Sequence, residues 1–294
     1  MRLFVEPGAG VDPVVRFIDG AQHRLDVAMY LLTDREVQSA LERDAKRGVR
    51  VRVMFEQHPY GTGPGNQSIY DSLRLAGIQV AWSPNQFRLS HDKYAIADGK
   101  VALVGTANWT YSAFTRNREY FVEDTESTDV GQLETLFNSD WGRQTAQLTD
   151  AYLVVSPINS RSDFVALINS AQRNVRVEAE EMQDPGIEDA LIQAAKRRVT
   201  VQVILPRPDP GRRDPNLIGE QRLTNGGVAV RTRRTPFIHA KSIEIDSHEA
   251  FIGSENVSAP SLDDNREVGL LISDHPAIQQ LRETFNHDWG HSQH

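Results

Sequence analysis

The sequence carries one pattern twice, and this repeat constrains the fold more than any other feature. Residues 91–108 and residues 239–256 both read H-x-K-x4-D followed by G-[ST]-x-N. Their histidines are 148 positions apart, and so are Asn108 and Asn256. A repeat of this length predicts two similar halves, and two copies of one polar cluster predict a single site assembled from both.

The repeat continues outside the motifs. Residues 17–32 resemble residues 167–182 at an offset of 150, so the second half has lost two residues before its motif. This change of length falls in a segment that contains proline in both copies, where it is easily absorbed. The repeat predicts an N-terminal domain over residues 1–145 and a C-terminal domain over residues 146–294.

Apolar runs alternate with amphipathic stretches in each half. In the first half we expect helices near 11–23, 34–47 and 67–76 and strands near 25–31, 49–55 and 78–82. Strands separated by helices predict an α/β fold with a largely parallel sheet covered on both faces. Asp98-Gly99 between two apolar runs predicts a hairpin, so each sheet is expected to be mixed. Each half is expected to end in a helix, near 129–141 and 275–289, with a linker over 142–157.

Composition places the chain among soluble globular proteins. It has 294 residues, of which 39% are hydrophobic and 24% charged. No apolar run approaches the roughly 20 residues that span a bilayer. The first residues lack the pattern of a signal peptide, which leaves both export and compartment open. There is no cysteine, which excludes disulfides, a thiol nucleophile and thiolate metal ligands.

The charge is unevenly distributed. The net charge is −8, yet residues 196–234 hold ten basic and three acidic side chains. The matching stretch 46–90 holds six basic and two acidic ones. Basic segments that lead into both motifs favour a site that attracts a polyanion. A solvated surface with uneven charge explains the same counts.

The motif residues suit phosphodiester chemistry. In an extended strand, His91 and Lys93 point to the same face, and so do His239 and Lys241. The segments that follow supply further hydrogen-bonding side chains for substrate: Thr106, Asn108, Ser254 and Asn256. One histidine can attack phosphorus covalently while the other donates a proton to the leaving group. The lysines neutralise the phosphate, so we expect neither a divalent metal nor a cofactor.

These residues resemble the signature of the phospholipase D superfamily, H-x-K-x4-D with a downstream G-[GS]-x-N. His91, Lys93 and Asp98 match the first part in one copy, and His239, Lys241 and Asp246 match it in the other. Two matches in register are far more specific than one. The resemblance implies two domains related by a pseudo-twofold axis, each a mixed β-sheet flanked by helices, and a metal-independent phosphohistidine mechanism.

The resemblance also implies roles for single residues. It makes His91 the nucleophile and His239 the general acid and base. Glu119 and Glu267 resemble the downstream acid that orients a catalytic histidine, across the domain interface. Asp98 and Asp246 belong to the signature, but their places beside turns favour a structural role over a chemical one.

The substrate class follows less directly from the residues. Asn108-Trp109-Thr110 and Asn117-Arg118-Glu119 resemble the short nuclease-like members, whereas cardiolipin synthases of the superfamily typically carry N-terminal membrane helices. We therefore expect a monomeric nuclease that hydrolyses nucleic-acid phosphodiesters. One alternative is a phospholipase D that hydrolyses or transphosphatidylates phospholipids. Another, of a different class, is an inactive module that binds polyanions.

Overall fold

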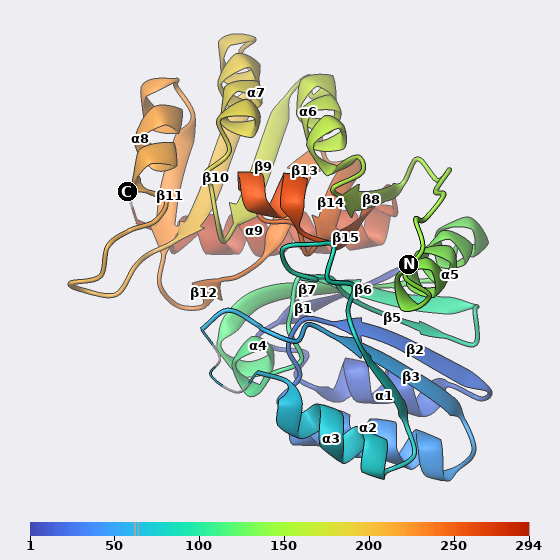
Figure 1. Cartoon of the computed structure of the whole chain (residues 1–294). Helices are drawn as coiled ribbons and strands as arrows, with labels where there is room; N and C mark the ends of the chain where they lie inside the picture. Colours follow the sequence, from blue (N-terminus) through green and yellow to red (C-terminus); the bar gives the residue numbers. More distant parts are fainter. Residues whose placement is uncertain (62, 64, 294) are drawn as a thin grey trace.

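Each half of the chain builds its own β-sheet in the computed structural model, which describes residues 1–61, 63 and 65–293 (Figure 1). The first half contains β1 (Arg2–Glu6), α1 (Asp12–Gly20), β2 (Arg24–Met29), α2 (Arg35–Lys46), β3 (Arg50–Phe55), α3 (Gln67–Leu75), β4 (Gln79–Trp82), β5 (Lys93–Ala97), β6 (Val101–Gly105), α4 (Tyr111–Thr115), β7 (Asn117–Asp124) and α5 (Ser127–Trp141). The second half contains β8 (Leu153–Ser156), α6 (Ser160–Ser170), β9 (Asn174–Ala179), α7 (Pro185–Lys196), β10 (Thr200–Pro206), α8 (Leu217–Asn225), β11 (Ala229–Arg233), β12 (Phe237–Ile238), β13 (Lys241–Ile245), β14 (Glu249–Gly253), the π-helical turn η1 (Pro260–Asp264), β15 (Glu267–Ile272) and α9 (His275–Gly290).

The sequence repeat is also a repeat of local structure. The Asp34 side chain caps α2 by accepting from two backbone amides, and Asp184 caps α7 in the same way. α2 is followed by Gly48 in the left-handed region, with φ of 93°, and Arg198 takes up that place after α7. The same N-cap residue, and a left-handed residue after the C-terminus, therefore set the same helix bounds in both halves.

Both sheets are mixed, which confirms the expected fold class. The first has the order β1-β7-β6-β5-β2-β3-β4, and the second has the order β11-β10-β9-β13-β14-β15-β8. β2, β3 and β4 run parallel, whereas β5 is antiparallel to both of its neighbours. Asp98 and Gly99 have positive φ at the β5–β6 turn, as the predicted hairpin requires.

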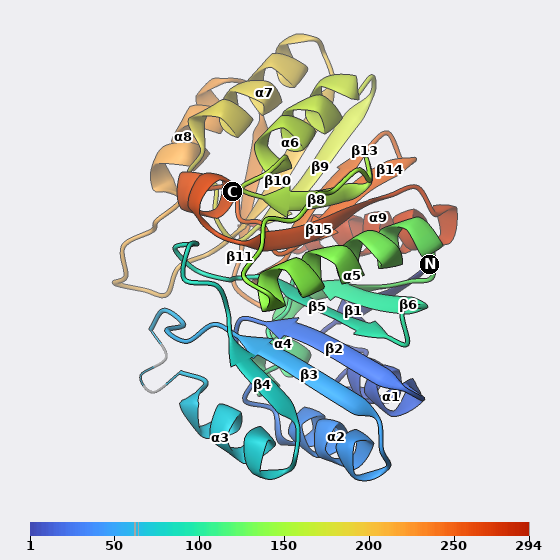
Figure 2. The same ribbon diagram turned by 45° about the vertical axis from the view of Figure 1, so that its right-hand side comes forward.

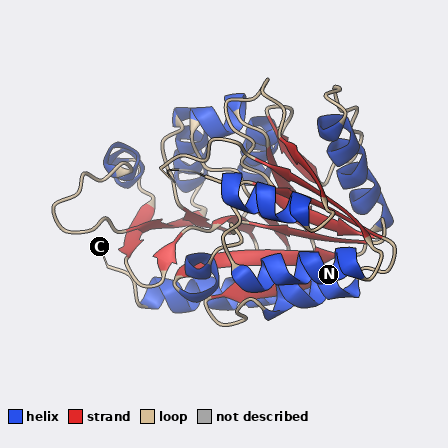
Figure 3. Cartoon of the chain, turned by 60° about the horizontal axis from the view of Figure 1, so that its bottom comes forward, coloured by secondary structure: helices blue, strands red, loops and turns tan. Residues whose placement is uncertain are grey.

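Three hydrophobic cores stack through the molecule. One lies between the first sheet and the helices α1, α2 and α3, and a second lies between the second sheet and α6, α7 and α8. The third core joins side chains of both sheets with those of α5 and α9. In Figure 2, α5 and α9 lie where the halves meet and the other long helices cover the outer faces. Figure 3 shows helices on both sides of the strands. Burial of this shared core holds the two halves together.

Several elements differ from the expectations. β5 begins at Lys93 and β13 at Lys241, so each motif histidine lies two residues before its strand rather than within it. The expected linker 142–157 contains a strand, since β8 begins at Leu153 and pairs with β15. The boundary between residues 145 and 146 falls between α5 and β8 and stays a prediction.

Candidate active site

The backbone of each half holds the histidine motif of the other half. The His91 amide donates to the carbonyl oxygen of Arg266 at 2.8 Å, and the His239 amide donates to that of Arg118 at 3.3 Å. Arg118 and Arg266 are equivalent residues at the starts of β7 and β15. Each histidine therefore reaches the site with its main chain fixed by the opposite domain.

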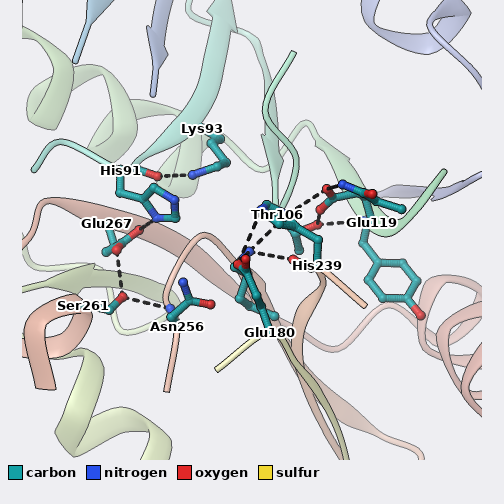
Figure 4. Close-up of polar contacts among 12 residues, drawn as sticks. His91, Lys93, Thr106, Glu119, Glu180, His239, Asn256, Ser261 and Glu267 are labelled. Carbon is teal, nitrogen blue, oxygen red and sulfur yellow. Dashed lines mark hydrogen bonds and ion pairs between the residues drawn. The ribbon is translucent and has the colours of Figure 1, made fainter. Parts of the chain in front are cut away.

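A buried glutamate of the opposite half then orients each imidazole. His91 Nδ1 lies 2.8 Å from Glu267 Oε2, and His239 Nδ1 lies 2.7 Å from Glu119 Oε1. Both carboxylates are completely buried. Because Nδ1 of each ring is engaged, Nε2 is the atom left for chemistry. Figure 4 shows the two pairs around one centre.

Each glutamate is itself fixed by short side chains. Thr106 Oγ1 donates to Glu119 Oε2 at 2.6 Å. On the other side, Ser261 Oγ and Asn265 Nδ2 donate to Glu267 Oε1 at 2.7 and 3.0 Å. Burial acts to raise the pKa of both carboxyls, but the adjacent histidine, the motif lysine and a hydrogen-bonding side chain together outweigh it, and the pKa of each lies below its usual value. Both groups are therefore ionised at neutral pH.

The motif lysines lie beside the histidines and are 2% exposed. Lys93 Nζ donates to the His91 carbonyl oxygen, and Lys241 Nζ donates to that of His239 at 2.6 Å. Burial lowers the pKa of Lys93 to about 7, against the opposing effect of Glu267. Lys93 is therefore only partly charged at neutral pH, and a bound phosphate would draw it to the ammonium form.

The charge state of His91 follows from the same environment. Burial lowers the pKa of its imidazole to about 4, and the charges of Lys93 and Lys241 act in the same direction while Glu267 opposes them. His91 is therefore neutral at pH 7. Since its Nδ1 faces a carboxylate, the proton lies on Nδ1 and the lone pair on Nε2.

A cavity of about 590 Å³ contains both histidines. Asn108 and Asn256 line it from opposite halves, as the repeat predicts. Tyr30, His58, Arg88 and Glu180 are also part of its wall. Among the described residues, no three His, Asp or Glu side chains are grouped as ligands for a metal.

Four residues of the predicted set lie elsewhere. The carboxylates of Asp98 and Asp246, which lie in the hairpin turns, accept hydrogen bonds from the backbone amides of residues 22–24 and 172–174. Thr106 and Ser254 are completely buried, and Ser254 Oγ accepts from the Val268 amide. We correct the expected substrate contact of Thr106 and Ser254 to a supporting position, because both hydroxyls are engaged inside the protein.

The two halves differ at one pair of equivalent positions that the sequence analysis did not select. Tyr30 follows β2, and its ring meets the edge of His91 with centroids 4.5 Å apart. Glu180 follows β9, with Oε2 2.7 Å from Lys241 Nζ and 3.4 Å from His239 Nε2. Both residues occur within the repeat at the offset of 150, so comparing the two strand ends would have revealed them.

The geometry of the site agrees with the protein family to which the sequence is matched. The family model described as "Cardiolipin synthase, PLD-like domain" matches residues 14–141 and 164–289. The chain belongs to this family. It is thus a member of the phospholipase D superfamily, as the doubled motif predicts.

Curated relatives point to the same family. The chain is similar to the major cardiolipin synthase ClsA of Bacillus subtilis, with 26% identity over 295 residues that cover 86% of this chain and 60% of the relative. It is also similar to the cardiolipin synthase of Geobacillus kaustophilus, with 26% identity over 322 residues that cover 94% of this chain and 63% of the relative. The chain thus spans about three fifths of these relatives.

Solved structures support the fold. A polyphosphate kinase of Porphyromonas gingivalis matches with a TM-score of 0.76 and 16% identity, over 97% of this chain and 46% of that one. A phosphatidylserine synthase of Haemophilus influenzae matches with a TM-score of 0.75 and 13% identity, over 97% of this chain and 85% of that one. Within the described residues, no helix is long and apolar enough to cross a bilayer.

Proposed function

We propose that this protein cleaves and transfers phospholipid phosphodiesters through a covalent phosphohistidine. The observation that carries the chemistry is the pair of imidazoles in one cavity, each oriented at Nδ1 by a buried carboxylate of the opposite half. Two such groups can divide one displacement into two steps, with a proton donor for the departing oxygen and a proton acceptor for the incoming one.

In the first step, Nε2 of neutral His91 attacks phosphorus. The P–N bond forms, the P–O bond to the leaving alcohol breaks, and His239 gives its Nε2 proton to the departing oxygen. In the second step, His239 takes a proton from water or an incoming alcohol, whose oxygen attacks phosphorus. The P–N bond then breaks, which returns His91 to the neutral form and leaves His239 protonated.

Tyr30 and Glu180 support this division of roles. His239 lies between two carboxylates, Glu119 at Nδ1 and Glu180 near Nε2. His91 has one carboxylate, and beside its ring lies Tyr30 rather than a second acid. Because the surroundings of the two rings differ in this way, we assign the attack on phosphorus to His91 and the proton transfers to His239. Lys93, Lys241, Asn108 and Asn256 complete the site as groups that stabilise the phosphoryl oxygens.

Two observations support phospholipid rather than the nucleic acid expected from the motif style. The matching family model and the two curated relatives are described as cardiolipin synthases, and the relatives align with 86% and 94% of this chain. An exposed aromatic side chain also lies at the catalytic cavity, since Tyr60 is part of its wall and is 89% exposed. Such side chains suit contact with a lipid surface.

A parallel assay tests the proposal. Phosphatidylglycerol vesicles, single-stranded DNA and RNA are each incubated with the native chain, His91→Ala and His239→Ala, with and without EDTA. We expect phospholipid turnover that survives EDTA and falls at least about 1,000-fold in both variants, since each removes a coupled role. Cleavage of DNA or RNA without phospholipid turnover would contradict the proposal and restore the nuclease interpretation.

A further inference from the structure

Buried polar side chains lie behind Glu119, on the opposite face of β7. Successive side chains of a strand point to opposite faces, so Arg118 and Tyr120 lie on the face away from Glu119. Arg118 Nε donates to Asp288 Oδ2 of α9 at 2.6 Å. The Tyr120 hydroxyl donates to Glu178 Oε2 of β9. Glu119 is therefore flanked by two contacts that β7 makes with the second half.

The two acceptors, Glu178 and Asp288, lie next to each other where α9 packs against β9. Both side chains are completely buried. Burial and the charge of Asp288 raise the pKa of Glu178 to about 8. Burial also acts on Asp288, but the contacts of Arg118, His287 and Arg233 outweigh burial, and its pKa lies below the usual value. At neutral pH, Glu178 therefore keeps a proton that it can share with the ionised Asp288.

These contacts restrain one short piece of backbone. The set consists of Arg118, Asp288, Glu178 and Tyr120, and we call it the β7 clamp. Because only Glu119 lies between the two clamp residues of β7, the clamp restrains Glu119 from both sides. Buried polar networks of this kind rigidify the backbone that carries them. Glu119 Oε1 in turn lies 2.7 Å from Nδ1 of His239 (Figure 4).

The clamp belongs to one half of the site. The described residues form no such clamp on the His91 side, where Ala28 and Val268 take the places of Glu178 and Tyr120. The side chains of alanine and valine carry no polar atom and can only pack. Proton transfer depends on a positioned donor and acceptor, and the proposed function gives the proton transfers to the histidine on the clamped side.

We propose that Tyr120 and Glu178 are positioning residues that hold Glu119, and through it His239, in the orientation for proton transfer. This inference rests on the proposed function and adds two residues to the half of the site that moves protons. Neither side chain reaches the substrate, since both are completely buried. With p-nitrophenolate as the leaving group the first step needs no acid, so opening the clamp is expected to slow only the second step.

Two substitutions open the clamp and two serve as controls. Tyr120→Phe removes only the hydroxyl that donates to Glu178, and Glu178→Ala gives this position the side chain of the equivalent Ala28. Glu178→Gln keeps a neutral polar group of similar size and is expected to keep the contacts. Tyr94→Phe is the matched control, because Tyr94 is completely buried and its hydroxyl has no hydrogen-bond partner among the described residues.

A single turnover of bis-p-nitrophenyl phosphate, with the protein in excess, separates the two steps. Release of p-nitrophenol follows the attack on phosphorus, and formation of p-nitrophenyl phosphate follows hydrolysis of the phosphohistidine. We expect Tyr120→Phe and Glu178→Ala to keep the first rate within about twofold and to lower the second at least about tenfold, because general acid–base catalysis contributes about 100- to 10,000-fold. Both controls are expected to keep both rates. Equal changes in the two rates, or no change in either, would overturn the proposal.

A measurement without turnover separates this inference from the proposed function. Nitrogen NMR of isotope-labelled histidine reports the hydrogen bond at each Nδ1, and His91→Ala and His239→Ala assign the signals. We expect both clamp-opening variants to change the ring shifts of His239 alone, which would support the clamp even if phospholipid were not cleaved. Unchanged shifts of His239, or equal changes at His91, would refute the clamp even if phospholipid were cleaved.

Discussion

At the scale of single residues, the protein places the two motif histidines in different surroundings. Both have a carboxylate at Nδ1, yet only His239 has a second one, Glu180, near Nε2. Lys93 and Lys241 are equivalent in sequence, but only Lys241 forms an ion pair with Glu180. The two copies of the motif therefore lie in different surroundings.

The lowered pKa values of His91 and Lys93 predict a pH profile for the free enzyme. Lys93 is charged below its pKa of about 7, so kcat/KM for bis-p-nitrophenyl phosphate is expected to decline as pH rises through 7. His91 is neutral above its pKa of about 4, so activity is expected to persist well below pH 6.5. Rates measured from pH 4 to pH 9 test both the expected decline on the alkaline side and the expected activity on the acid side.

The control for the alkaline limb is Lys93→Arg. A guanidinium stays charged throughout this range, so the decline above pH 7 is expected to disappear, whatever the absolute rate. An unchanged alkaline limb in Lys93→Arg would show that another group titrates there.

At this scale the sequence predicted the motif residues but not their surroundings. Histidines, lysines and asparagines were found because the pattern occurs twice in register. Tyr30 and Glu180 were missed because they differ between the halves, and a search for what repeats passes over a difference. Thr106 and Ser254 were expected to contact substrate, yet their strands turn the hydroxyls toward β7 and β15.

At the scale of elements, two buried ion pairs join the halves. Arg118 of β7 donates to Asp288 of α9 at 2.6 Å, and its counterpart Arg266 lies 2.9 Å from Asp140 of α5. Each arginine directly precedes the glutamate that orients a histidine of the opposite half. The ion pairs therefore fix the strand starts from which the catalytic glutamates extend. The repeated aspartates were visible in the sequence, but their partners across the interface were not.

Breaking one of these pairs is expected to destabilise the whole protein. Asp140→Ala leaves the guanidinium of Arg266 buried and unpaired, so we expect a loss of about 3–5 kcal/mol in the free energy of unfolding. Asp19→Ala removes the partner of Arg43 in a pair with about half-exposed side chains and is expected to cost less than about 1 kcal/mol. Urea unfolding followed by circular dichroism measures both. Equal losses would mean that the Asp140 pair does not connect the halves energetically.

At the scale of the whole molecule, the repeat predicted the α/β class and the mixed sheets because alternating apolar runs and turn residues are local signals. It did not predict the shared core of α5, α9 and both sheets, since contacts between halves leave no periodic pattern. The nuclease expectation relied on motif style and on missing membrane helices. The absence of membrane helices does not distinguish a nuclease from a phospholipid enzyme, because this chain spans only about three fifths of its cardiolipin synthase relatives.

The central claim is that both halves form one centre in which His91 carries the phosphoryl group. Quenching in alkaline denaturant, which preserves the P–N bond, during turnover of bis-p-nitrophenyl phosphate labelled at phosphorus, followed by peptide mapping, tests it most directly. We expect label on His91 in the native protein, none in His91→Ala, and more in His239→Ala, because p-nitrophenolate departs without an acid while the second step lacks its base. Label on His239 in the native protein, or label retained in His91→Ala, would contradict the account.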